Sequence, residues 1–300
     1  MQDISHCWIP DLLRPQKSLF PTRQNADASV RRWEDGKAYF RRSEVLRRGI
    51  FMTLYEFFQK VPKAALAFSG GVDSAYLLYA ARSCGAQVRA YYVKSAFQPQ
   101  FELDDATRLA TELGVDMRVL EVDVLTAPQI TANPADRCYH CKNAIFRTIL
   151  EAAAEDGFSV LMDGTNASDD AGDRPGMRAL RELEVRSPLR ECGLKKAEIR
   201  QLSKEAGLFT WDKPAYACLA TRIPTGETIT KEKLQRTERA EDYLFAAGFT
   251  DLRVRMMGGA ARIQLPEDQL PLLLDKRQAI LDEFKKYYNT VLLDLEVRGG

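Results

Sequence analysis

A glycine-rich segment that follows a short apolar run constrains the fold of this chain more than any other feature. It reads Ser69-Gly70-Gly71-Val72-Asp73-Ser74. The apolar residues 63–68 before it predict a buried strand, and residues 75–81 after it predict a helix. Adjacent glycines leave room for a phosphate group, which the backbone N–H groups and the positive end of the helix would face. Asp73 would supply the oxygen ligands that Mg²⁺ prefers.

The two commoner nucleotide-binding loops do not match this segment. A Walker loop carries Lys and Ser or Thr after its last glycine, and a dinucleotide fingerprint spaces its glycines as G-x-G-x-x-G. Here the glycines are adjacent and the loop contains no lysine. The same residues could form a tight strand-to-helix turn without a ligand. The two serines and the aspartate, in a strand–loop–helix context, favour phosphate binding.

Strands alternate with helices in the part of the chain that we assign to residues 48–224. Expected strands cover residues 63–68, 88–93, 117–122 and 159–162, and expected helices cover residues 49–59, 75–85, 103–113 and 143–154. This alternation is typical of an α/β fold in which a parallel sheet is covered by helices on both faces. Ligands of such sheets bind at the carboxyl ends of the strands, where the glycine-rich loop would lie.

The pattern changes after residue 224, and residues 225–300 predict a smaller α+β domain. Expected helices cover residues 231–247 and 267–288, and expected strands cover residues 252–256, 261–265 and 291–297. Residues 1–47 are rich in Arg, Gln, Asp and Pro and show weak periodicity. We interpret them as an N-terminal extension and assign it no function.

Composition excludes several classes of function. The formal net charge of the 300 residues is +1, so no global field attracts nucleic acid or a membrane surface. The 2 histidines, His6 and His140, argue against a His-based triad or a multi-histidine zinc site. The 6 cysteines are too few for a disulfide scaffold in a chain of this length. With no secretory signal and no apolar run near the roughly 20 residues of a membrane span, we expect a cytoplasmic protein.

A second polar loop closes the expected strand at residue 162. It reads Asp163-Gly164-Thr165-Asn166, and Asp169 and Asp170 follow. These are turn-forming residues, so an ordinary turn is one interpretation. Because the loop would lie at the same sheet edge as the glycine-rich segment, we favour contact with a nucleotide or with Mg²⁺, and Asp169 is a second candidate magnesium ligand.

Three cysteines are candidates for chemistry. Cys138 and Cys141 form a CxxC pair just before an expected helix, where the helix N-terminus and two flanking basic residues should lower the thiol pKa. The pair could be a redox couple, metal ligands or packed free thiols. Cys218, in a proline-bounded loop, could be a third ligand or a small buried apolar residue. Three thiolates around a cubane cluster leave one iron open to bind a substrate or an extra sulfide.

Arginines mark the expected small sheet. Arg253 and Arg255 alternate on one strand, and Arg262 lies on the next. Alternation places Arg253 and Arg255 on one face of the sheet. This face is either solvated or an anion site, since Arg suits bidentate contact with phosphate and carboxylate groups.

Taken together, these segments resemble a known family. The glycine-rich loop resembles the pyrophosphate-binding loop of the ATP pyrophosphatase superfamily, a Rossmann-like fold. The chain from about residue 48 to its end resembles LarE, the ATP-dependent sulfur transferases that mature the nickel-pincer nucleotide cofactor of lactate racemase. Matching stretches lie at residues 69–74, 137–142, 163–170, 173–180, 186–200, 211–227, 253–265 and 292–298.

The resemblance implies a reaction. ATP adenylates a carboxylate of pyridinium-3,5-biscarboxylic acid mononucleotide, sulfur displaces AMP, and a thiocarboxylate results. Members with one cysteine of the Cys218 type sacrifice its sulfur, whereas members that also carry the CxxC pair hold a [4Fe–4S] cluster with a transferable sulfide. This chain has all three cysteines, so the resemblance implies the cluster type.

The resemblance also assigns residues. ATP and Mg²⁺ would be held by the residues named above in the two polar loops, namely Ser69, Gly70, Gly71, Val72, Asp73, Ser74, Gly164, Thr165, Asn166 and Asp169. Arg222, Arg253 and Arg255, with Arg262 beside them, would bind the phosphate and carboxylates of the substrate. We also expect a homo-oligomer, a C-terminal domain that serves the substrate or oligomerisation, and a donor of sulfide.

Two other functions compete with that of a sulfur transferase. One is another ATP pyrophosphatase, either a tRNA thiolase or an amide-forming ligase. No glutaminase domain is evident, and the near-zero net charge argues against a tRNA substrate. The other is a nucleotide-binding iron–sulfur sensor without turnover, which accumulation of AMP and pyrophosphate would exclude.

Overall fold

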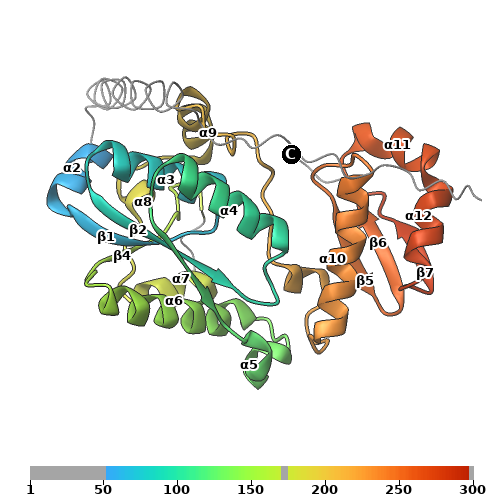
Figure 1. Ribbon diagram of the computed structural model, residues 1–300. Coiled ribbons are helices and arrows are strands. Elements are labelled where there is room, and N and C mark those ends of the chain that lie inside the picture. The colour runs from blue at the N-terminus through green and yellow to red at the C-terminus, as the bar shows by residue number, and fades with distance from the viewer. Residues whose placement is uncertain (1–51, 170–174, 297–300) are drawn as a thin grey trace, which may run out of the picture.

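The first half of the molecule is built on one parallel sheet. The computed structural model describes residues 52–169 and 175–296. The sheet has four strands in the order β3-β2-β1-β4, and every neighbouring pair is parallel (Figure 1). The strands are β1 (Lys63–Ala67), β2 (Gln87–Lys94), β3 (Met117–Glu121) and β4 (Leu161–Met162). The expected α/β fold is therefore confirmed, with a central β1 that delivers the glycine-rich loop to the carboxyl edge.

Helices cover both faces of this sheet, with α3 and α4 on one face and α6 and α7 on the other (Figure 1). α3 is buried around its whole circumference from residue 74 to residue 81, because it lies between the sheet and an outer layer that includes α9. The bounds are α2 (Leu54–Lys60), α3 (Val72–Ser83), α4 (Gln100–Glu112), η1 (Val124–Thr126), α5 (Pro128–Thr131), α6 (Arg137–Glu155), α7 (Pro175–Glu182), α8 (Pro188–Glu191) and α9 (Lys196–Glu205).

A second, three-stranded sheet lies C-terminal to the first, as expected. Its order is β5-β6-β7, with β5 and β6 antiparallel and β6 and β7 parallel. Leu244, Val254, Ile263 and Phe284 are almost fully buried in its core. The bounds are η2 (Leu219–Arg222), α10 (Lys231–Ala246), β5 (Arg253–Met257), β6 (Ala260–Gln264), η3 (Glu267–Gln269), α11 (Leu270–Asp275), α12 (Arg277–Phe284) and β7 (Thr290–Leu293).

Two expected helices differ from the structure. The single helix expected over residues 267–288 is three segments, η3, α11 and α12. Pro271 occupies the first turn of α11, where its missing N–H and fixed φ are suited to a new helix start. The helix expected from residue 143 begins instead at Arg137, so the CxxC pair lies within the first turns of α6 rather than before it.

Some expectations lie outside the described residues. These are the N-terminal extension, the start of the helix expected at residue 49, and Asp170 in the second polar loop. Within the described ranges, no helix is long and apolar enough to cross a membrane.

Candidate active site

The glycine-rich loop connects the end of β1 to the start of α3. Gly70 has a φ of +71°, and a Cβ at this position would lie 3.1 Å from the Cβ of Ala106, so both the backbone angle and the close approach require glycine. The hydroxyl groups of Ser69 and Ser74 lie 3.1 Å apart and close the loop on itself. Gly71 caps α3 without a side-chain hydrogen bond. The first N–H groups of the helix therefore have no side-chain acceptor from the cap residue, which suits an anion.

The second polar loop packs directly against the first. A Cβ on Gly164 would lie 2.9 Å from the backbone N of Ser74, so only glycine permits this approach. Asp163 holds its own loop, because its Oδ1 accepts from the Ser187 hydroxyl at 2.7 Å and its Oδ2 accepts from the Thr165 hydroxyl at 2.5 Å. Since β1 and β4 are parallel neighbours, their following loops meet at one edge.

Asp73 lies at the junction of the two loops. Its Oδ1 accepts from the Asn166 side-chain amide at 3.4 Å, and its Oδ2 accepts from the Lys196 ammonium. Burial raises the pKa of Asp73, and the Lys196 charge opposes this shift. The negative charge of Asp169 also raises the pKa of Asp73, which places the two carboxylates within electrostatic range. A partly buried carboxylate that is paired with one lysine fits a site that receives Mg²⁺ together with phosphate oxygens.

Lys196 is a site residue that the motifs did not identify. It is the first residue of α9 and stands 123 positions after Asp73 along the chain. Lysine is a common phosphate-binding residue, so Lys196 can contact either the carboxylate or a phosphate in the same loop. It supplies the cation that the glycine-rich loop itself lacks.

The three candidate cysteines come from two segments that are tied together. Cys138 and Cys141 lie in the first turns of α6, and Cys218 is the N-cap of η2. The Arg137 guanidinium joins the segments, since its Nη1 donates to the Asn133 side chain at 2.5 Å and to the Ala220 carbonyl at 3.1 Å. The structure thus brings the CxxC pair and the Cys218 loop to the same region.

Cys141 does not have the lowered pKa that the flanking basic residues predicted. Burial raises the pKa of Cys141 to about 12, and the charges of Cys218 and Cys138 raise it further. Burial likewise raises the pKa of Cys218, against the opposing charge of Arg137. The prediction was wrong for Cys141 because removal from water outweighs the basic neighbours. These thiols would ionise readily only beside additional positive charge.

Three thiols are the donor type that iron–sulfur clusters take, and Cys138, Cys141 and Cys218 influence one another electrostatically, with Cys138 exposed. However, no group of three or more His, Cys, Asp or Glu side chains has metal-binding spacing within residues 52–169 and 175–296. The five cysteines in these ranges are free thiols, namely Cys84, Cys138, Cys141, Cys192 and Cys218.

A cavity connects the glycine-rich loop with the Cys218 loop. Its volume is about 260 Å³, and Ser69 and Cys218 both line it. Aromatic side chains form much of the wall, among them Phe68, Phe146 and Tyr216. A molecule activated at the glycine-rich loop would therefore share a cavity with the Cys218 thiol.

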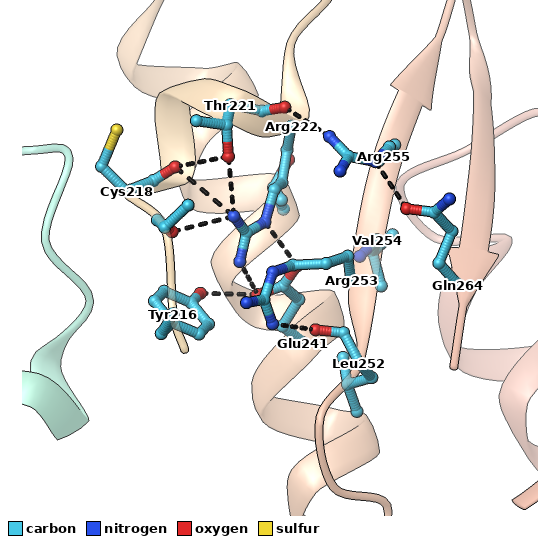
Figure 2. Close-up of polar contacts among 12 residues, drawn as sticks. Tyr216, Cys218, Thr221, Arg222, Glu241, Leu252, Arg253, Val254, Arg255 and Gln264 are labelled. Carbon is cyan, nitrogen blue, oxygen red and sulfur yellow. Dashed lines mark hydrogen bonds and ion pairs between the residues drawn. The ribbon is translucent and has the colours of Figure 1, made fainter. Parts of the chain in front are cut away.

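Arg222 and Arg253 form a buried cluster behind Cys218 (Figure 2). The Arg222 Nε and Nη2 donate to the two carboxylate oxygens of Glu241 at 2.8 and 3.0 Å, and the Tyr216 hydroxyl donates to Glu241 at 2.5 Å. Arg222 and Arg253 also lie over the Tyr216 ring, at 4.5 and 4.7 Å from its centroid. Arg222 is 1% exposed and Arg253 is 3% exposed, so both guanidinium groups are enclosed by protein.

The cluster holds the backbone around Cys218. The Arg222 Nη1 donates to the Ala217 carbonyl at 2.8 Å, and the Arg253 Nη2 donates to the Ala215 carbonyl. Figure 2 shows the Cys218 sulfur directed away from the two guanidinium groups. The arginines thus contact the carbonyl oxygens of the loop, while the thiol points elsewhere.

The other two arginines proposed for the substrate lie on the small sheet. Arg255 and Arg262 are direct partners across β5 and β6. The Arg255 Nε donates to the Gln264 side chain at 2.6 Å and its Nη1 donates to the Thr221 carbonyl at 2.8 Å, whereas Arg262 pairs with Asp294 at 3.3 Å. Both are partly exposed, in contrast to Arg222 and Arg253.

Comparison with known proteins adds three findings. The family model of "Queuosine biosynthesis protein QueC" matches residues 63–172, the parallel-sheet part of the chain. The pyridinium-3,5-bisthiocarboxylic acid mononucleotide synthase of Lactiplantibacillus plantarum is 33% identical over 220 residues, which are 73% of this chain and 80% of that protein. An uncharacterized protein of Synechocystis is 41% identical over 219 residues, 72% of this chain and 81% of its own length.

A more distant likeness is to the tRNA-specific 2-thiouridylase MnmA of Thermotoga petrophila. The two are 25% identical over 196 residues, which cover 50% of this chain and 54% of that enzyme.

Proposed function

Because this chain belongs to the family of the pyridinium-3,5-bisthiocarboxylic acid mononucleotide synthase, we propose that it is an ATP-dependent sulfur transferase acting on pyridinium-3,5-biscarboxylic acid mononucleotide. The chain is an enzyme of the ATP pyrophosphatase type. The observation that carries the proposal is the shared cavity of Ser69 and Cys218. It supports activation of a carboxylate and attack by sulfur in one shared space.

The first step would be adenylation. A carboxylate oxygen of the substrate attacks the α-phosphorus of ATP, the bond to the β-phosphate breaks, and pyrophosphate leaves. The glycine-rich loop would hold the departing pyrophosphate through the N–H groups at the start of α3. Asp73 and Asp169 would hold Mg²⁺, and Lys196 would exchange its contact with Asp73 for a phosphate oxygen.

The second step would be sulfur transfer. A sulfur nucleophile attacks the carbonyl carbon of the acyl adenylate, the bond from this carbon to the AMP oxygen breaks, and a thiocarboxylate forms. Cys138, Cys141 and Cys218 would hold a [4Fe–4S] cluster, which when bound would supply transferable sulfide. The buried cluster of Arg222, Glu241 and Arg253 would keep the Cys218 loop in place.

The substrate would be held at the rim of the small sheet. We assign its phosphate, and the carboxylate that is not activated, to Arg255 and Arg262, which are partly exposed. The enclosed Arg222 and Arg253 would act through the loop that they hold. We further propose a domain boundary near residue 224, a homo-oligomer, an external donor of sulfide and a cytoplasmic location, where free thiols persist.

Incubation of the anaerobically purified protein with MgATP, the biscarboxylic nucleotide and inorganic sulfide tests the proposal. We expect AMP, pyrophosphate and a nucleotide in which one oxygen is replaced by sulfur. Formation of an adenylate without sulfur transfer would contradict the assignment. If transfer RNA is added to the same assay, its thiolation would support the alternative that the likeness to MnmA suggests.

A further inference from the structure

One carboxyl group lines the shared cavity and has no partner of its own. Glu102 lies in the first turn of α4, and it lines the cavity together with Ser69 and Cys218. Among the described residues, no hydrogen bond or ion pair involves its carboxyl group. Glu102 is partly buried, so its carboxyl can pair with a bound cation without first giving up another partner.

The rest of the wall suits a flat ring. The aromatic residues Phe68, Tyr92, Phe146 and Tyr216 are among the residues that line the cavity, and no Lys, Arg or His is. The Tyr216 ring already lies against Arg222 and Arg253, so stacking on a ligand would fall to the other three. Glu102 is therefore the one carboxyl that faces this space from the described lining residues. Aromatic faces and a carboxylate both attract a cation, and aromatic faces also stack on a planar ring.

The positive charges near Glu102 compensate the burial of its carboxyl only in part. Burial raises its pKa to about 7, while positive charges nearby oppose the shift. These cations already have partners, since Lys213 pairs with Asp105 at 2.7 Å and Arg222 pairs with Glu241 at 2.8 Å. The charged and titratable groups that act on Glu102, or on which it acts, are Tyr92, Asp105, Lys213, Arg222 and Arg253.

We propose that Glu102 is a specificity-determining residue that selects a cationic aromatic ring in the shared cavity. This inference rests on the proposed function, which supplies such a ring in the pyridinium of the substrate. The ring would stack on the aromatic wall, and its positive charge would face the Glu102 carboxylate. A neutral ring of the same shape would lack the second interaction.

The test compares a charged ring with a neutral one. The probes are pyridinium-3,5-biscarboxylic acid mononucleotide and its 1,4-dihydropyridine form, which keeps the same phosphate and carboxylates. Binding is measured calorimetrically on wild type, on Glu102→Gln, and on Asp104→Asn, an exposed carboxyl of the same helix. We expect Glu102→Gln to lose about tenfold in affinity for the charged probe and less than about twofold for the neutral one. Asp104→Asn should bind both probes as wild type does.

The pH dependence gives a second readout. A bound cation favours the ionised carboxylate, so binding below pH 7 must first remove a proton from Glu102. Wild-type affinity for the charged probe, relative to the neutral probe, should therefore rise as the pH increases to about 7 and then level off. The ratio should stay flat in Glu102→Gln.

Three results would overturn the inference. Equal losses of affinity for both probes in Glu102→Gln would show that Glu102 does not distinguish a charged ring from a neutral one. An unchanged affinity for both probes would show that it does not contact the ring. Weaker binding of MgATP in Glu102→Gln, with the charged probe unaffected, would assign the carboxyl to the nucleotide instead. If wild type bound MgATP and neither probe, the proposed function itself would fail, and this inference with it.

Discussion

Replacement of Glu241 by glutamine tests whether its buried ion pair with Arg222 stabilises the fold. Glu241 is 1% exposed and accepts four hydrogen bonds, two from Arg222, one from Tyr216 and one from the Val254 backbone N–H at 2.8 Å (Figure 2). A glutamine keeps one acceptor oxygen, but its amide nitrogen would face donor groups of Arg222 and Tyr216. It also removes the negative charge that pairs with the enclosed Arg222 guanidinium.

The expected cost follows from this arrangement. Removing one partner of a buried ion pair costs about 3–5 kcal/mol, because the other charge stays buried without compensation. We therefore expect Glu241→Gln to lower the free energy of unfolding by about 3–5 kcal/mol in urea titrations followed by circular dichroism. Glu232→Gln, an exposed position on the same helix, is the matched control and should change it far less.

A double replacement separates the ion pair from simple packing. Arg222→Met combined with Glu241→Leu removes both charges and should recover all but about 1–2 kcal/mol of the wild-type stability. A Glu241→Gln loss similar to that of the control would refute the account of a compensating buried pair. So would a double variant that is less stable than the single one.

Two further predictions concern the loops that bind ATP. Asp73→Asn should reduce pyrophosphate release by about 100-fold or more, because the oxygen ligand for Mg²⁺ and the partner of Lys196 are both lost; a rate within threefold of wild type would exclude this role. Gly164→Ala should weaken MgATP binding measured by calorimetry, since the added Cβ would lie 2.9 Å from the Ser74 backbone N and force the loops apart. Gly71→Ala is less crowded, with its nearest contact at 3.4 Å from the Ser69 hydroxyl oxygen, so it should disturb the loops less. Equal effects of the two changes would argue against the contact between the loops.

Local patterns in the sequence identified the sheet and its two polar loops. The Ser69–Ser74 segment could be interpreted because its strand, glycines and helix are adjacent in the chain, and the meeting of the two loops follows from parallel strand order. Helix ends were less predictable. Residues 137–142 lack an apolar pattern, yet α6 begins there, because the buried Arg137 is anchored by Asn133 and by the distant Ala220 carbonyl.

Contacts between distant segments could not be predicted in this way. Lys196 reaches Asp73 across 123 positions, and Glu241 reaches Arg222 from a helix that otherwise appears simply charged and exposed. The pKa of Cys141 also differs from the expectation. The sequence shows the basic neighbours that would lower this pKa, but it does not show the burial that raises it. Glu102 carried no motif at all, and the cavity alone distinguishes it from the other acidic residues of α4.

The most direct test of sulfur transfer beside the ATP loop is mass spectrometry of the nucleotide product from wild type and from Cys218→Ala, with pyrophosphate measured in the same reactions. The account predicts that wild type forms both pyrophosphate and the thiocarboxylate, and that Cys218→Ala still releases pyrophosphate but forms no thiocarboxylate. Thiocarboxylate formation at the wild-type rate by Cys218→Ala would contradict the role given to the shared cavity.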